Sequence, residues 1–252
     1  MSLARHACLL FLLAISLTAF AQTKTVWANI DDYPICTGST YAGCWQSSSS
    51  LAGGTTVSIS GPTPTASPSM DGSSAQFSVG QNSGYGNGLW WANTICCTTG
   101  VSSAYSNFEY DLYFYITTPS LSQALEFDVN QTISTSSTSA VRYVFGTQCE
   151  SVVSNQWQVW DEGTGWINTG VHCVMPSARW NHVVWDFQRT SSGQVYFISL
   201  TFNGHKYYIN KQFGPRILNV SADDLNVAFQ MDTRSSGAAY STWLDEIKLS
   251  AW

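Results

Sequence analysis

Near the centre of the chain, acidic and apolar residues alternate in a way that places two carboxylates on one surface. The segment from Leu125 to Gln131 reads LEFDVNQ, and Glu126, Asp128 and Asn130 occupy every second position in it. In a β-strand every second side chain lies on the same face, so these three residues would share one face. Carboxylates at this spacing, about 6.5–7 Å between Cα atoms, suit a glycan-cleaving acid pair, a divalent-metal site or a sugar-binding surface. The plain alternative is a solvated strand face.

Candidate partners of this acidic strand are one arginine and three tryptophans. Arg142 lies on a predicted strand that follows the acidic one, where it can pair with either carboxylate. Trp91 belongs to an adjacent pair of tryptophans, and adjacent strand residues face opposite ways, so at most one of that pair is core. Trp160 and Trp166 flank a predicted hairpin turn. An exposed indole beside polar side chains suits stacking on a sugar ring, although ordinary packing would also explain each tryptophan.

Strand signals continue from residue 75 to the end of the chain. No segment after residue 21 sustains the 3.6-residue periodicity of a long helix. Strands are predicted at 75–79, 108–116, 125–129, 141–145, 156–160, 180–187, 195–202, 206–209, 225–231 and 240–249. Asn203-Gly204 between two of them predicts a type I′ hairpin turn. Roughly ten to fourteen strands without a helix predict an all-β fold, a two-sheet antiparallel β-sandwich.

The two ends of the chain are expected to pair as strands, at 26–32 and 243–249. Residues 22–252 would then form one domain, and the Ser-, Thr-, Pro- and Gly-rich segment 47–69 would be a surface excursion from it. Pairing of the ends would also bring Asp31 and Asp32 toward Asp245. Carboxylate oxygens suit Ca²⁺, so these residues are candidates for a structural calcium site, with exposed edge-strand acids as the alternative. No other cofactor is predicted.

The first 21 residues predict an export signal. Arg5 precedes an apolar run at 8–17, and Ala19-Phe20-Ala21 fits signal-peptide cleavage before Gln22. No later stretch is apolar enough to span a membrane. The sequence has a net charge of −6 and only 10% charged residues, which argues against nucleic acid and anionic membranes as partners. A secreted protein, extracellular or periplasmic, is therefore expected.

Six of the seven cysteines remain once the signal segment is removed. An even number in an exported chain favours disulfides over metal thiolates. Several pairings are open from sequence alone. Short spacing favours Cys36–Cys44 and Cys149–Cys173, which would leave Cys96 and Cys97 to each other.

Five short motifs carry a resemblance to a known family. They are Ser69-Met70-Asp71-Gly72 before a strand, Phe108–Ile116 followed by Leu125–Val129, Trp180-Asn181-His182-Val183, Phe202-Asn203-Gly204, and the closing Trp243–Leu249. In these the chain resembles the concanavalin A-like lectin/glucanase superfamily, and it is similar to uncharacterised exported bacterial proteins of that architecture. The resemblance implies a jelly roll.

Two branches of that superfamily have motifs comparable to the acidic strand. Laminarinase-type hydrolases carry E-x-D-x-x-E, of which Glu126 and Asp128 match the first two acids, while Gln131 stands in place of the third. Glutamine does not donate a proton as a carboxylic acid does. Legume lectins bind manganese and calcium on a similar Glu-Phe-Asp strand, but the downstream Asp and His that they also use are not matched here.

The missing third acid favours binding over cleavage. The sequence therefore predicts a secreted carbohydrate-binding β-sandwich that recognises an extracellular or cell-wall polysaccharide through a concave aromatic and acidic face. Abundant aromatics and scarce Lys and Arg favour a neutral glycan. A glycoside hydrolase or polysaccharide lyase using Glu126 and Asp128 is the first alternative, and a cell-surface adhesion or structural protein is the second.

Overall fold

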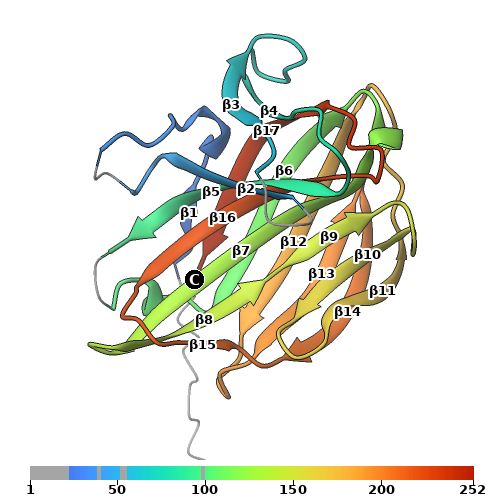
Figure 1. The fold of residues 1–252 in the computed structure, drawn as a ribbon. Helices are drawn as coiled ribbons and strands as arrows, with labels where there is room; N and C mark the ends of the chain where they lie inside the picture. The colour runs from blue at the N-terminus through green and yellow to red at the C-terminus, as the bar shows by residue number, and fades with distance from the viewer. Residues whose placement is uncertain (1–22, 39–40, 52–55, 98–99) are drawn as a thin grey trace, which may run out of the picture.

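Alternating apolar residues build two antiparallel sheets that face each other across one core. The computed structural model describes residues 23–38, 41–51, 56–97 and 100–252. Figure 1 views the sandwich from the outer face of a nine-stranded sheet, with an eight-stranded sheet behind it. The predicted all-β, two-sheet antiparallel sandwich of jelly-roll type is confirmed.

The eight-stranded sheet has the order β14-β13-β12-β6-β17-β4-β3, with β1 paired to β17. Its strands are β14 (His205–Phe213), β13 (Val195–Phe202), β12 (Trp180–Arg189), β6 (Asn107–Ile116), β17 (Tyr240–Ala251), β4 (Ser74–Val79), β3 (Ile59–Thr65) and β1 (Thr25–Trp27).

The nine-stranded sheet has the order β11-β10-β9-β7-β16-β5-β2, and β8 pairs with both β7 and β15. Its strands are β11 (Gly165–His172), β10 (Gln156–Asp161), β9 (Thr147–Glu150), β7 (Ser122–Ser136), β16 (Asp224–Thr233), β5 (Gly86–Cys96), β2 (Trp45–Leu51), β8 (Ser139–Phe145) and β15 (Arg216–Leu218). The helices among the described residues are three single 3₁₀ turns, η1 (Ile30–Asp32), η2 (Ser102–Ala104) and η3 (Pro119–Leu121).

Period-2 alternation decides which side chains fill the core. On β7, Leu125, Phe127 and Val129 have no exposed surface, and the aromatic and aliphatic face of β6 is equally buried. The ring of Phe127 lies 5.4 Å from that of Phe114 on the facing sheet, measured between centroids. Burial of each such side chain contributes about 1.5–3 kcal/mol. Glu126, Asp128 and Asn130 of β7 are consequently held on the outer face of the nine-stranded sheet.

One predicted local feature is confirmed in part and another in full. The ends of the chain pair antiparallel in the eight-stranded sheet, but only Thr25–Trp27 pairs, with 249–251, and Ile30–Asp32 forms a 3₁₀ turn where the sequence predicts a strand. Asn203 and Gly204 have φ values of 48° and 83°, the positive values that a type I′ turn needs, and they join β13 to β14.

Segment 47–69 contains more regular structure than its composition predicts. It includes most of β2 and all of β3, which pair with β5 and β4. Both are the last strands of their sheets. Proline is tolerated on an edge strand because half of the backbone N–H groups there have no ladder partner, so Pro62 and Pro64 do not prevent pairing.

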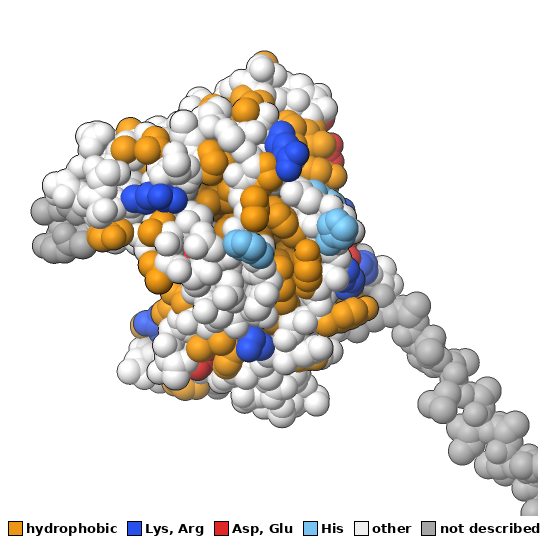
Figure 2. Space-filling view, turned by 90° about the vertical axis from the view of Figure 1, so that its right-hand side faces the viewer, with side chains coloured by type: hydrophobic (Ala, Val, Ile, Leu, Met, Phe, Trp, Pro, Cys, Tyr) orange, Lys and Arg blue, Asp and Glu red, His pale blue; other side chains and the backbone are white. Residues whose placement is uncertain are grey.

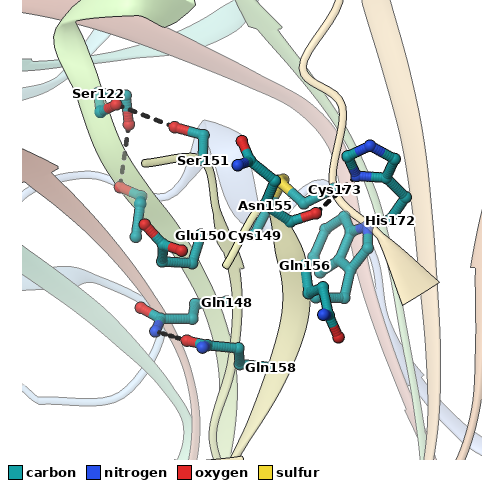
Figure 3. Close-up of a disulfide and its surroundings, with 12 residues drawn as sticks. Ser122, Gln148, Cys149, Glu150, Ser151, Asn155, Gln156, Gln158, His172 and Cys173 are labelled. Atoms are coloured by element: carbon teal, nitrogen blue, oxygen red, sulfur yellow. Dashed lines mark hydrogen bonds between the residues drawn. A yellow bond between two sulfur atoms is a disulfide. The ribbon is translucent and has the colours of Figure 1, made fainter. Parts of the chain in front are cut away.

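The six cysteines pair as the spacing suggests. The Cα atoms are 4.9 Å apart in Cys36–Cys44, 5.3 Å in Cys149–Cys173 and 3.7 Å in Cys96–Cys97. Figure 3 shows Cys149 of β9 bonded to Cys173, which directly follows β11. This bond closes a loop around the β10–β11 hairpin and fixes the base of that hairpin to its neighbour.

The predicted signal peptide, residues 1–21, lies outside the described residues. Within the described part of the chain, no helix is long and apolar enough to cross a bilayer. Figure 2 views the molecule from the side of β11 and β14, where hydrophobic side chains gather in a band down the middle. The margin formed by the outer face of the nine-stranded sheet is hollowed in this view.

Candidate functional site

A groove with a cavity volume of about 730 Å³ opens on the outer face of the nine-stranded sheet. Its lining includes all seven residues that the sequence predicts for carbohydrate binding, which come from β5, β7, β8, β10 and β11: Trp91, Glu126, Asp128, Asn130, Arg142, Trp160 and Trp166. The structure therefore brings together residues that are up to 75 positions apart in the sequence, 166 minus 91. A pocket of this size suits a small ligand or a few sugar rings.

The floor of the groove is a row of side chains across three neighbouring strands. Asp128 of β7 lies opposite Ala228 of β16, and Ala228 lies opposite Trp91 of β5. Adjacent strands are about 4.8 Å apart, so the backbones of Asp128 and Trp91 are separated by roughly 10 Å. Because Ala228 has only a methyl group, the space between the carboxylate and the indole stays open.

Two half-buried tryptophans from the β10–β11 hairpin line the other side of the groove. Trp160 and Trp166 are direct cross-strand partners, and their rings meet edge to face with centroids 5.2 Å apart. Gly146 lies against the first of these rings. A Cβ there would lie 2.9 Å from the Cβ of Trp160, so a larger residue would displace the indole. Trp157, of opposite parity, is fully buried in the core.

Three carboxyl groups cluster at the end of the groove away from Arg142: Glu126 and Asp128 line the groove, and Asp232 lines a separate, smaller cavity. The side-chain amide of Gln230 donates to Glu126 (2.5 Å) and to Asp232 (3.0 Å). Glu126 and Asp232 lie close enough to repel each other when both are charged, so protonation of one of the two carboxyls is favoured. Asp128 accepts the backbone N–H of Thr147 at 2.9 Å.

Burial raises the pKa of every acid in this cluster. For Glu126 the pKa lies well above its usual range, first because burial penalises the charged form and then because Asp232 and Asp128 repel it. Burial also raises the pKa of Asp128 to about 7 and that of Asp232 to about 7, partly offset by the hydrogen bonds that each accepts. The cluster therefore holds exchangeable protons near neutral pH, which suits hydrogen bonding to sugar hydroxyls and also acid–base chemistry.

The sequence did not identify Gln230, which lines the groove, or Asp232, which accepts a hydrogen bond from Gln230 beside it. They lie on β16, where the sequence shows a strand because its apolar residues alternate. The same alternation indicates a polar face on this strand, because every second residue but one is polar: Asp224, Asn226, Gln230 and Asp232. No local sequence pattern predicts that this face adjoins Glu126, because the pairing of β16 with β7 joins segments about a hundred residues apart.

Gln131 does not lie in the groove. It is fully buried on the core side of β7, where its amide donates to the carbonyls of Ser102 (2.6 Å) and Tyr105 (2.9 Å). Its side-chain oxygen accepts from Arg189. The position that would supply the third acid of the hydrolase motif is therefore structural, and Asp232 supplies a third carboxyl from the adjacent strand.

Arg142 does not pair with Glu126 or Asp128, and that expectation is wrong. Its Nε donates to Thr132 (2.9 Å), and its Nη2 lies 3.6 Å from a carboxylate oxygen of Asp224. The strand register explains this, because Arg142 lies opposite Thr132, four residues or roughly 13 Å along β7 from Asp128. Arg142 therefore occupies one end of the groove.

The acids near the chain ends form a separate group. Asp31 accepts the backbone N–H of Ile247 (2.8 Å), and Asp245 accepts those of Met70 (2.6 Å) and Glu246 (2.8 Å), while Asp32 is exposed. Burial, with repulsion from Asp245 and Asp32, raises the pKa of Asp31 to about 7. The described residues include no cluster of three or more His, Cys, Asp or Glu side chains that could hold a metal. Calcium at Asp31 and Asp245 stays a prediction, and carbonyl oxygens would have to complete its ligand set.

Millimolar Ca²⁺ is expected to raise the melting temperature relative to EDTA. A cation between Asp31 and Asp245 would offset their repulsion and, by binding only the folded state, would stabilise it. For a chain of this length each kcal/mol corresponds to roughly 2–4 °C. Differential scanning fluorimetry of wild type and Asp245→Asn measures the effect. Equal melting in Ca²⁺ and EDTA would mean that these acids act only as hydrogen-bond acceptors.

No protein-family model matches this sequence, and no curated protein matches it. Among solved structures, peanut lectin with a bound peptide is 8% identical, with 92% of this chain and 98% of that one covered and a TM-score of 0.47. Arcelin-5, a lectin-like defence protein from Phaseolus vulgaris, is 11% identical, with 92% and 99% covered and a TM-score of 0.46. A carbohydrate esterase of Shiga toxin-encoding bacteriophage phi24B is 13% identical, with 82% and 89% covered and a TM-score of 0.43.

Proposed function

We propose that this chain is a secreted carbohydrate-binding β-sandwich that recognises an extracellular or cell-wall polysaccharide through the groove. One observation carries the proposal: Trp91 lies on one side of Asp128, and the Trp160–Trp166 pair lines the same cavity from the β10–β11 hairpin. A sugar ring has an apolar face and a rim of hydroxyls. Indoles complement the face, and carboxyl and amide groups complement the rim.

The polar groups of the floor support this function in a second way. Asn130 donates to Asn226 at 3.1 Å, and Gln230 donates to Glu126 and Asp232, so these polar side chains are held by hydrogen bonds in two separate groups. Their orientations are therefore set before a ligand arrives, which lowers the entropy lost on binding. Together the groups offer amide donors and carboxyl acceptors to sugar hydroxyls.

Replacement of Trp160 by alanine is expected to weaken glycan retention. Loss of one stacking indole costs about 1 kcal/mol or more, which is a roughly 5-fold loss of affinity. Affinity gel electrophoresis against a panel of plant and microbial polysaccharides measures it. Trp180→Ala is the matched control, because Trp180 is a half-buried indole on β12 of the other sheet. Equal losses in both variants would point to a general effect on the fold, and retention of no glycan by wild type would favour the adhesion or structural alternative.

A polysaccharide-cleaving enzyme is the second candidate, and one observation favours it. Glu126, Asp128 and Asp232 lie together, and burial raises the pKa of all three. Carboxyls whose pKa values lie near neutrality are the usual general acids of glycan hydrolysis. This arrangement does not need the acid that is missing at position 131.

A further inference from the structure

One end of the groove carries two arginines on neighbouring strands. Arg142 of β8 and Arg216 of β15 are direct cross-strand partners, and both line the cavity. The whole sequence has only ten Lys and Arg residues. Two of these ten therefore face one another at one end of a pocket whose floor is otherwise acidic and amide-rich.

The charges at this end do not balance within the protein. Like charges directly opposite each other on antiparallel strands are destabilising. Asp224 is 3.6 Å from Arg142 and neutralises one of the two guanidinium groups. The exposed side chain of Arg216 has no hydrogen bond, ion pair or ring contact with any residue that the structure describes. One positive charge, with five N–H donors, is left facing the cavity.

We propose that the Arg142–Arg216 pair binds an anionic substituent, a carboxylate or a sulfate, on an acidic sugar of the recognised glycan. This inference rests on the proposed function and names the ligand class for the same groove. Guanidinium groups match such oxyanions because their parallel N–H donors form paired, charge-assisted hydrogen bonds. An anion between the two arginines would also remove their mutual repulsion.

The rest of the groove limits how many charges the glycan carries. Asp128 and Glu126 lie on the floor, roughly 13 and 20 Å along β7 from the arginine pair, and Asp232 lies farther along on β16. A continuous polyanion would place its further charges against these acids. The groove therefore selects a mainly neutral glycan with isolated acidic residues over a polyuronate. This differs from the wholly neutral glycan that the composition favours, because composition counts the basic residues without showing that two of them converge.

Paired glycans that differ only in the anionic group test the proposal. Binding is measured by titration calorimetry with glucuronoxylan and its carboxyl-reduced form, and with carrageenan and its desulfated form. The first pair reports on carboxylate and the second on sulfate. We expect wild type to prefer the charged member of one pair by about 10-fold or more, the value of a hydrogen-bonded charge. Polygalacturonate is expected to bind more weakly than the preferred glycan.

Arg216→Gln is expected to remove this preference while leaving affinity for the uncharged member unchanged. The matched control is Lys211→Gln, the same loss of charge on β14 of the other sheet, which should behave as wild type. Because Arg216 is exposed, its replacement should not lower the melting temperature. If it does, Arg216→Lys retains the charge and tests the paired donors alone, with a partial loss of the preference expected.

Two results would overturn the proposal in distinguishable ways. Equal binding of charged and uncharged members by wild type, unaffected by Arg216→Gln, would refute the anionic ligand and leave carbohydrate binding standing. Retention of none of these glycans or of any neutral polysaccharide would refute the proposed function, and this inference with it.

Discussion

The melting temperature of this protein is expected to rise when the pH is lowered from about 7.5 to about 5. Asp128, Asp232 and Asp31 each have a pKa of about 7 in the folded chain, against 3.8 for an unperturbed aspartate. Between these values the folded state binds more protons than the unfolded state. The free energy of unfolding therefore falls as the pH rises through this window, by about 1.4 kcal/mol per pH unit for each proton.

Acids whose pKa is lowered in the folded chain affect stability in a different pH range. Hydrogen bonds from the backbone around Val153 and Ser154 lower the pKa of Glu150, and those from Thr164 and Gly163 lower that of Asp161. Their contribution is present above the unfolded pKa and is lost only as the pH falls through the lower, folded value. Stability should therefore be highest in mildly acidic solution and should fall on both sides.

Asp232→Asn tests how much the carboxyl cluster contributes to this pH dependence, separately from the other titrating groups. The variant removes one acid of the cluster, so it should flatten the pH dependence and raise stability near pH 7.5. Glu246→Gln, an exposed carboxyl on β17, is the control and should melt as wild type at every pH. Thermal melts in a series of buffers measure both. A melting temperature that rises with pH across this range would contradict the raised pKa values of this cluster.

Glu126→Gln separates binding from cleavage. If the groove only binds, wild type retains its glycan and releases no reducing ends, and the variant retains it as well. If Glu126 is an acid, base or nucleophile, wild type releases product and the variant is slower by at least about 10²-fold, because an amide does not exchange a proton. We expect the first result. Reducing-end release measured beside affinity electrophoresis tells the two apart.

The control for this experiment is Glu109→Gln on the outer face of β6. Glu109 is an acid of the other sheet that pairs with Lys24, so its loss leaves the groove intact. A loss of product release in this variant as well would point to the fold and not to the groove. Product release by wild type that disappears only in Glu126→Gln would make the enzyme the correct function.

Local sequence pattern determined much of this protein. The alternation in Leu125–Gln131 fixed which side chains of β7 face outward, and Asn203-Gly204 fixed a hairpin turn. Short spacing between cysteines suggested the pairs that the structure contains. The strand alternation and the hairpin turn depend on neighbours within a few residues, where backbone geometry alone limits the outcome, and the cysteine pairs on spacings of at most 24 residues. They were sufficient to predict the sandwich and seven residues of one groove.

Only the tertiary structure decided what those residues have as neighbours. Asp232 reaches Glu126, Arg216 reaches Arg142, and Gln131 points into the core, none of which alternation reveals. The Ser- and Pro-rich β2 and β3 became strands because sheet edges accept them. The physical reason is that a strand's period is local, whereas its partner is selected by burial of the whole core. The sequence therefore determined the faces, and strand pairing decided the chemistry that gathers on them.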